Sequence, residues 1–221
     1  MNPPDTSKFP FRRDFEREEQ TRLCAAAIEG IRLRLGSDWQ NLCVPTADRN
    51  PRLRAARKLV KGVIRVAGES TDHQRTVDFI TLAAAQSIDA ARLSHKKGAS
   101  LAGHLSDTTC LSHEHMVPCE TVLKALVEAP ADTSLFEILD PLTYRALVCK
   151  TTERPLLDSK PIKSALPPLE KTRLARSVRM EEVSPAFKAL MRYDVIGVLE
   201  HLIPISDRAG KLLPAYLERS A

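Results

Sequence analysis

Apolar residues recur every three to four positions along much of the chain, a spacing typical of helices that bury one face. The stretch 13–35 has this pattern and is followed by Gly36, a residue type that often terminates a helix. The stretch 51–67 has it too, and Asn50 with Pro51 supplies an N-cap and a proline at the first helical position. We therefore predict helices over 13–35 and 51–67.

The same spacing predicts helices elsewhere, whereas residues 142–150 are the best candidate for a strand because they mix Tyr, Val, Thr and Cys. Eight glycines in 221 residues favour helices over a β-sandwich. The predicted fold is mainly α. A helical, basic N-terminal region (1–105) is followed by a region (106–221) that holds a small two-stranded ββα-like element, formed by 112–119 and 143–150, and C-terminal helices. The further predicted helices cover 71–93, 120–127, 169–182, 185–203 and 207–219.

Composition and charge restrict the partners and the compartment. A net charge of +5 and a pI near 9.0 favour a nucleic-acid partner only where the cations cluster. An aromatic content of 5% argues against a surface that stacks single-stranded bases. No stretch approaches the ~20 apolar residues of a membrane helix, so we expect no membrane partner. Cys24 and Cys149 lie in apolar stretches, which indicates buried thiols in a reducing, cytoplasmic environment.

Cations cluster in two places. The denser set lies within 51–67. One interpretation is that these cations contact a phosphate backbone, and the other is that they form a solvated helix face. The second set, Arg173, Arg176 and Arg179, has the spacing i, i+3, i+6, which places all three on one broad face of the predicted helix. The cations of the first set are Arg52, Arg54, Arg57, Lys58, Lys61 and Arg65.

The segment from Cys110 to Cys119 (CLSHEHMVPC) concentrates metal-binding and titratable side chains. One interpretation is a zinc site with the spacing C-x2-H-x-H-x3-C, although structural zinc sites usually join two ligand pairs from separate elements. Another is that His113 and His115 are ordinary polar residues that precede a helix started by a proline. The third interpretation is catalytic: in an extended strand the two histidines point to one face and Glu114 to the other, unless a bulge rotates them.

A Glu-His pair followed by two apolar residues and a proline resembles the first strand of the HNH (ββα-metal) nucleases. Later stretches are similar in order and spacing to a group of bacterial HNH-like proteins, so the resemblance covers about residues 112–198. It implies that Glu114 binds a divalent metal and that His115 is the general base that activates water against a phosphodiester. The later stretches are Val148–Leu157, Ile162–Pro167 and Met191–Val198.

Two family positions differ in this chain. Where the family has a second metal ligand, usually histidine, the chain has Arg154, and an arginine cannot bind a metal cation. Glu153 or Asp158 is then the alternative ligand, because carboxylates bind Mg²⁺. The asparagine that orients the family's general base is also missing from the matching stretch. The expected cofactor is Mg²⁺ or Mn²⁺, with Zn²⁺ as the alternative.

The sequence thus leads to two hypotheses from different classes. The first is a metal-dependent HNH-like endonuclease that hydrolyses DNA, of the kind found in bacterial defence. The second is a non-catalytic helical module on a degenerate nuclease frame, which binds nucleic acid or protein and is indifferent to chelators. A helical partner protein in a multi-component system, without any nucleic-acid role, is a third possibility. The predicted nucleic-acid contacts are Arg54, Arg57, Lys58, Lys61, Arg173 and Arg176.

Overall fold

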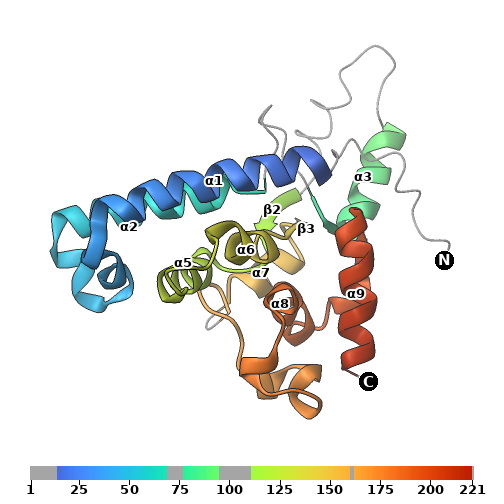
Figure 1. Cartoon of the computed structure of the whole chain (residues 1–221). Helices are drawn as coiled ribbons and strands as arrows, with labels where there is room; N and C mark the ends of the chain where they lie inside the picture. Colours follow the sequence, from blue (N-terminus) through green and yellow to red (C-terminus); the bar gives the residue numbers. More distant parts are fainter. Residues whose placement is uncertain (1–13, 69–76, 95–110, 160–161, 221) are drawn as a thin grey trace.

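The computed structural model describes residues 14–68, 77–94, 111–159 and 162–220, which form a mainly helical protein around a small sheet (Figure 1). The two N-terminal helices, α1 (Asp14–Leu35) and α2 (Pro51–Val66), lie side by side and are joined by two short 3-10 helices. The Asn50 side chain caps α2 by accepting the backbone N–H groups of Arg52 and Leu53, as the Asn-Pro pair predicts. The mainly α fold class is confirmed.

The sheet has four strands in the order β2-β3-β1-β4. Strand β3 pairs antiparallel with β2 and parallel with β1, and β1 pairs antiparallel with β4. All residues of β3 are buried, because it is covered on both faces. The predicted two-stranded element is therefore only half of a mixed sheet. The strands are β1 (Phe79–Thr81), β2 (Leu111–His115), β3 (Arg145–Cys149) and β4 (Leu202–Pro204).

The main hydrophobic core joins the first and second predicted regions. It includes Ile28 of α1 and Ile64 of α2 together with Leu123 of α5 and Tyr193 of α8, all fully buried. Since β1 comes from the first region and pairs with strands of the second, the two regions share one sheet as well as one core. The remaining α-helices are α3 (Leu82–Ser94), α5 (Cys119–Glu128), α6 (Leu135–Leu139), α7 (Glu153–Leu157), α8 (Lys188–Val195) and α9 (Asp207–Arg219).

Three predicted helices are wrong in part. Within 71–93, residues 71–76 lie outside the described residues, and 79–81 form the strand β1, so the helix begins only at Leu82. The hydroxyl of Thr81 accepts the backbone N–H of Ala84, which starts α3 directly after the strand. A short apolar run that is buried on both sides occurs in strands as well as in helices. The spacing of its apolar residues therefore does not distinguish a strand from a helix.

The predicted helix 169–182 is instead a series of 3-10 turns: Leu169–Lys171, Arg173–Arg176 and Met180–Glu182. The chain is extended at Thr172, whose hydroxyl donates to the carbonyl of Leu169, and such local bonds compete with the helical ladder. Within the predicted helix 185–203 only Lys188–Val195 is α-helical, as α8, and 3-10 turns flank it at Pro185–Phe187 and Leu199–His201. Gly197, just beyond α8, has a φ of 74° that favours glycine, and β4 begins at Leu202.

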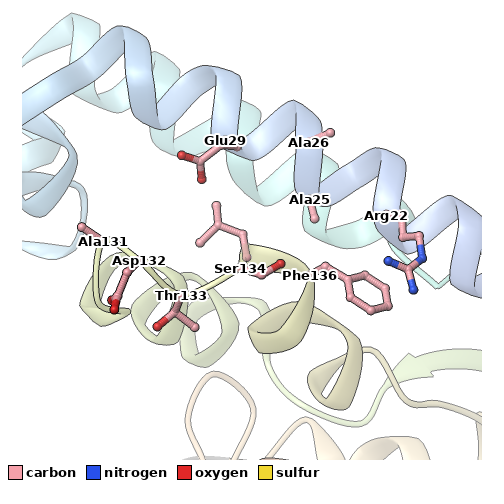
Figure 2. A pocket seen from close by; sticks show the side chains of 10 residues that line it. Arg22, Ala25, Ala26, Glu29, Ala131, Asp132, Thr133, Ser134 and Phe136 are labelled. Carbon is pink, nitrogen blue, oxygen red and sulfur yellow. The ribbon is translucent and has the colours of Figure 1, made fainter.

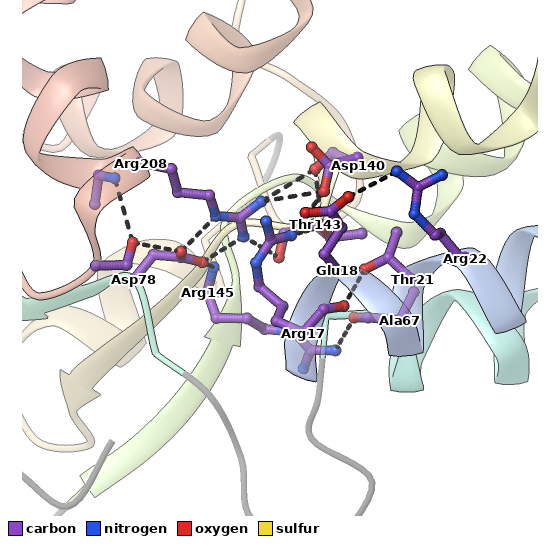
Figure 3. A network of polar contacts seen from close by, with 12 residues as sticks. Arg17, Glu18, Thr21, Arg22, Ala67, Asp78, Asp140, Thr143, Arg145 and Arg208 are labelled. Atoms are coloured by element: carbon purple, nitrogen blue, oxygen red, sulfur yellow. Dashed lines mark hydrogen bonds and ion pairs between the residues drawn. The ribbon is translucent and has the colours of Figure 1, made fainter. Parts of the chain in front are cut away.

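A buried carboxylate, Asp78, connects β1 to β3 and α9 (Figure 3). Its Oδ1 accepts from Nε of Arg208 at 2.6 Å and from the hydroxyl of Ser206 at 2.8 Å. Its Oδ2 accepts from a second nitrogen of Arg208 at 2.6 Å and from the backbone N–H of Arg145 at 2.9 Å. Burial alone raises the pKa of Asp78, but the Arg208 guanidinium and the Arg145 amide together hold it below the ordinary value.

We predict that Asp78→Asn lowers the free energy of unfolding by about 3 kcal/mol at neutral pH, because it removes the charge with which the largely buried Arg208 guanidinium forms its shortest contacts. The folded pKa of Asp78 lies below the unfolded one, so its contribution is complete above about pH 4 and disappears as the pH falls through the folded pKa. Urea unfolding at pH 7 and pH 3 measures both effects. The control Asp89→Asn, at an exposed position of α3, should change stability by less than about 0.5 kcal/mol. An equal loss in both variants contradicts the prediction.

Candidate functional site

Strand β2 carries the predicted catalytic segment and presents its side chains alternately to two sides of the sheet. Glu114 lies opposite Ala146 and His115 opposite Arg145 in a regular antiparallel ladder, without a bulge. Ser112 and Glu114 share one face, and their side chains are hydrogen-bonded at 3.2 Å. His113 and His115 therefore belong to the other face, as the alternation predicts.

On the first face, two carboxylates converge on one guanidinium. The Arg154 guanidinium forms an ion pair with the buried carboxylate of Glu114. It also contacts Asp158 on the next turn of the chain, with Nε at 2.7 Å from Oδ2 and a second nitrogen at 3.3 Å from Oδ1. The hydrogen bonds from Arg154 lower the pKa of Asp158, and Lys163, at 3.4 Å, lowers it further. We call Glu114, Arg154 and Asp158 the arginine cluster.

The arginine cluster brings together two of the predicted metal ligands, Glu114 and Asp158, around a protein cation. A guanidinium keeps its charge at any physiological pH and has no lone pair for a metal. The carboxylates are thus neutralised by a covalently tethered cation at the place where the resemblance expects a metal ion.

The third predicted metal ligand, Glu153, is used elsewhere. Its carboxylate accepts the backbone N–H of Cys149 at 2.8 Å and the hydroxyl of Thr152 at 2.9 Å. These bonds close the turn between β3 and α7, and the Glu153 side chain is buried there. Its geometry is that of a turn-stabilising carboxylate.

His115, the predicted general base, lies at the C-terminal end of α2. Its Nε2 is 3.1 Å from the carbonyl oxygen of Arg65. Since a carbonyl only accepts hydrogen bonds, Nε2 is the donor. The Arg145 guanidinium donates to the same oxygen and, at 2.7 Å, to the carbonyl of Ala67 (Figure 3). Together they satisfy the last carbonyls of α2, where the helix dipole favours donors and cations.

Arg192 is a site residue that the sequence did not identify as one. Its buried guanidinium donates to the carbonyls of His115 at 3.0 Å and of Leu157 at 3.1 Å, so it ties the end of β2 to α7. Burial lowers the pKa of Arg192. The sequence signal was an arginine that follows three apolar residues in the predicted helix, which indicates a buried polar contact but not its partner.

The predicted nucleic-acid contacts differ in how far they are neutralised. In α2, Arg57 pairs with Glu120 at 3.0 Å and with Asp48 at 3.3 Å, and Lys61 also pairs with Glu120. Burial would raise the pKa of Glu120, but Lys61 and Arg57 lower it. Arg54 and Lys58 are exposed and form no ion pair with any residue that the structure describes.

These α2 cations surround a hollow of about 350 Å³. We call it the basic hollow. It is lined by Asp48, Arg54, Arg57, Lys58, Lys61, Arg65 and Glu120.

The predicted face formed by Arg173, Arg176 and Arg179 is wrong, because no continuous helix carries these residues. Arg173 pairs with Asp194 at 3.1 Å and with Glu200 at 2.9 Å, and Arg179 pairs locally with Glu182. Arg176 is exposed. The second cationic set is therefore divided among separate turns.

A separate hollow of about 430 Å³ lies between α1 and the start of α6 (Figure 2). Its charged lining residues are Arg22, Glu29 and Asp132. The Arg22 guanidinium is 4.0 Å above the ring of Phe136 and pairs with Glu18, so it is already engaged within the protein. This hollow contains none of the predicted site residues.

The zinc interpretation gains no support from the described part of the chain. Within it, no three His, Cys, Asp or Glu side chains are placed to hold a metal ion. Cys110 lies outside the described residues, and Cys119 starts α5 as a free thiol. Cys24 and Cys149 are buried, as their apolar surroundings predict. The helices in the described ranges include none that is both long and apolar enough to cross a membrane.

Neither a family model, nor a characterised protein, nor a solved structure matches this chain. The function therefore has to be inferred from the geometry described above. The HNH resemblance stays a prediction.

We predict that Arg154→Met lowers the free energy of unfolding by about 2 kcal/mol, because the Glu114 carboxylate is then buried without its cation. The double variant Arg154→Met/Glu114→Gln should recover part of that loss, since it removes both charges. Urea unfolding of the two single variants and the double variant gives the coupling. The control Arg179→Met breaks an exposed pair and should leave the urea midpoint close to that of the wild type. A double variant that is no more stable than Arg154→Met would refute the pairing.

Proposed function

We propose that this protein is a non-catalytic nucleic-acid-binding module built on a nuclease-like ββα element. The observation that carries the proposal is the basic hollow, in which five cations face two carboxylates. Arg54 and Lys58 are exposed at this hollow, and the whole of α2 contains no acidic residue. An excess of clustered cations is what binds phosphates and releases their counterions.

The spacing of the cations suits an extended polyanion. Arg54, Lys58, Lys61 and Arg65 follow one another at intervals of three or four residues, and so form a row along one side of α2. At 1.5 Å per residue the row is about 16 Å long. Because two carboxylates offset part of this charge, the row neutralises about three phosphates.

The arrangement of β2 favours binding over hydrolysis. A one-metal nuclease places its metal and its general base at the same phosphate. Here Glu114 and His115 lie on opposite faces of a strand, and Arg154 already neutralises the carboxylates on one of them. The Nε2 of His115 is engaged with the end of α2. These contacts give the ββα element a structural role next to the binding helix.

We predict that the protein binds duplex DNA with little sequence preference and an affinity that falls with salt. If three phosphates are neutralised, the logarithm of the association constant should fall with the logarithm of the salt concentration with a slope of about −2.7. Arg54→Glu/Lys58→Glu should weaken binding by at least about tenfold, because it reverses two exposed charges of the row that no described carboxylate neutralises. Fluorescence anisotropy with a labelled duplex at several salt concentrations measures both.

The matched control is Lys211→Glu/Arg219→Glu, which makes the same change in net charge at exposed positions of α9, away from α2 (Figure 1). It should keep the affinity within about twofold, since only the general field changes. Equal losses in both double variants would show that net charge, and not the basic hollow, attracts the DNA.

We further predict that the purified, folded protein leaves plasmid DNA intact with Mg²⁺, Mn²⁺ or Ni²⁺, and that EDTA does not change its affinity for DNA. The reason is that Arg154 supplies the positive charge for Glu114 and Asp158. Gel analysis of plasmid and anisotropy with EDTA test this. Cleavage that disappears both with EDTA and in His115→Ala would establish the nuclease instead.

A further inference from the structure

A second face of α2 carries an exposed apolar strip next to the basic hollow. The Leu59 side chain is 57% exposed and that of Val66 is 41% exposed, although both are large aliphatic residues. Together with Ala55, Gly62 and Val63 they line a hollow of about 520 Å³, to which Lys58 is the one charged residue that the described ranges contribute. We call this face the apolar strip. Most residues of this kind are buried in a folded domain, so a contiguous exposed strip indicates a binding surface.

The spacing of the strip is that of a helix that pairs with another helix. Ala55, Leu59, Gly62 and Val66 are separated by four, three and four residues, which is the alternation of d and a positions in a heptad. The inner face of α2 uses different positions, Leu53, Val60 and Ile64, to pack into the core of the protein. Val63 lies between the two faces and packs against the core, whereas Leu59 and Val66 extend the apolar surface beyond it into solvent.

Nothing in the described part of the chain requires a glycine at position 62. A Cβ atom placed on it meets nothing within 4 Å, and its backbone is ordinary α-helix rather than left-handed. A glycine inside a helix costs about 1 kcal/mol relative to alanine. A glycine at the centre of the apolar strip allows the backbone of another chain to approach closely, because no side chain stands in the way.

The charges beside the seam define the partner. In the heptad frame set by Leu59 and Val66, the flanking g positions are Lys58 and Arg65, and both are exposed. A second copy of α2 packed on the first would bring these cations together with further cations, because α2 has no acidic residue. A helix with glutamate or aspartate beside its apolar seam would pair with them instead.

From these observations we infer that the apolar strip of α2 binds an amphipathic helix of a partner protein, whose apolar a and d residues are flanked by acidic residues. This interaction is separate from the proposed nucleic-acid binding. The seam uses Ala55, Leu59, Gly62 and Val66, whereas the row of cations turns toward Glu120 on α5. Lys58 and Arg65 lie at the boundary of the two faces.

The test uses the full chain and a synthetic peptide of about three heptads with Leu at a and d and Glu at e and g. The Glu residues keep this peptide from pairing with itself. A second peptide has Lys at e and g and the same apolar residues. Titration calorimetry should show that the acidic peptide binds at least about tenfold more tightly than the basic one.

The decisive variant is Gly62→Gln, which places a side chain in the seam without altering charge. It should weaken binding of the acidic peptide by about tenfold or more, because the helix can no longer approach closely. The matched control is Gly30→Gln on α1, where a Cβ atom also meets nothing within 4 Å. Both substitutions raise helix propensity, so neither should unfold the protein. Gly30→Gln should bind the acidic peptide like the wild type.

Nucleic-acid binding is tested on the same variants to keep the two interactions apart. Gly62→Gln should leave the affinity for duplex DNA unchanged, and Arg54→Glu should weaken DNA binding while leaving peptide binding within about twofold. The inference is overturned if the two peptides bind equally, or if Gly62→Gln binds the acidic peptide like the wild type. It is also overturned if sedimentation shows a dimer that Gly62→Gln dissociates, since the occupant is then a second copy. Loss of DNA binding in Gly62→Gln would assign the strip to nucleic acid.

Discussion

The Asp78 carboxylate is the contact on which the arrangement of the other elements depends. It accepts from the Arg208 guanidinium at the start of α9 and from the backbone N–H of Arg145 at the start of β3. The Arg145 guanidinium in turn reaches the last carbonyls of α2. A buried, charged hydrogen-bond network of this kind is directional, and removing one member leaves the others desolvated without partners. The position of α2, and with it the orientation of both of its exposed faces, thus depends on a carboxylate in the sheet.

The arginine cluster applies the same principle on the other side of β3. A buried Glu114 needs a cation nearby, and Arg154 supplies it from α7 without any requirement for a bound ion. A metal site is stable only while its ligands and its metal are both present, whereas a guanidinium is part of the chain. Along the chain, α5 and α6 separate β2 from β3, and α7 follows β3 directly. The order of elements is set by hydrophobic pattern and turns, so it does not determine which cation neutralises Glu114.

Sequence signals predicted an element correctly where neighbouring residues set its ends. They failed where a segment distant in the sequence determines whether the residues form a strand or a helix. Asn50 and Pro51 start α2 as predicted, because capping involves neighbouring residues only. Residues 79–81 become a strand since β3 and β4 pair with them, and neither lies nearby in the sequence. At the site, the alternation of Glu114 and His115 was predictable from strand geometry. The neutralisation of Arg57 and Lys61 by Glu120 was not, because about sixty residues separate them.

The packing role of α2 and the two binding roles that we propose for it use different positions. The core takes up Leu53, Val60 and Ile64 of α2, with Ala56 and Val63 packed beside them, and leaves the side that carries Leu59 and Val66 exposed. Single exposed leucines occur elsewhere, as at Leu33 of α1, but a contiguous apolar strip with a glycine at its centre, which weakens the helix, indicates a partner. The row of cations would be sufficient for binding nucleic acid, and that binding would not require a glycine at position 62. An apolar strip and a row of cations on adjacent faces of α2 are therefore better explained by two ligands than by one. Substitutions within the apolar strip distinguish the two explanations.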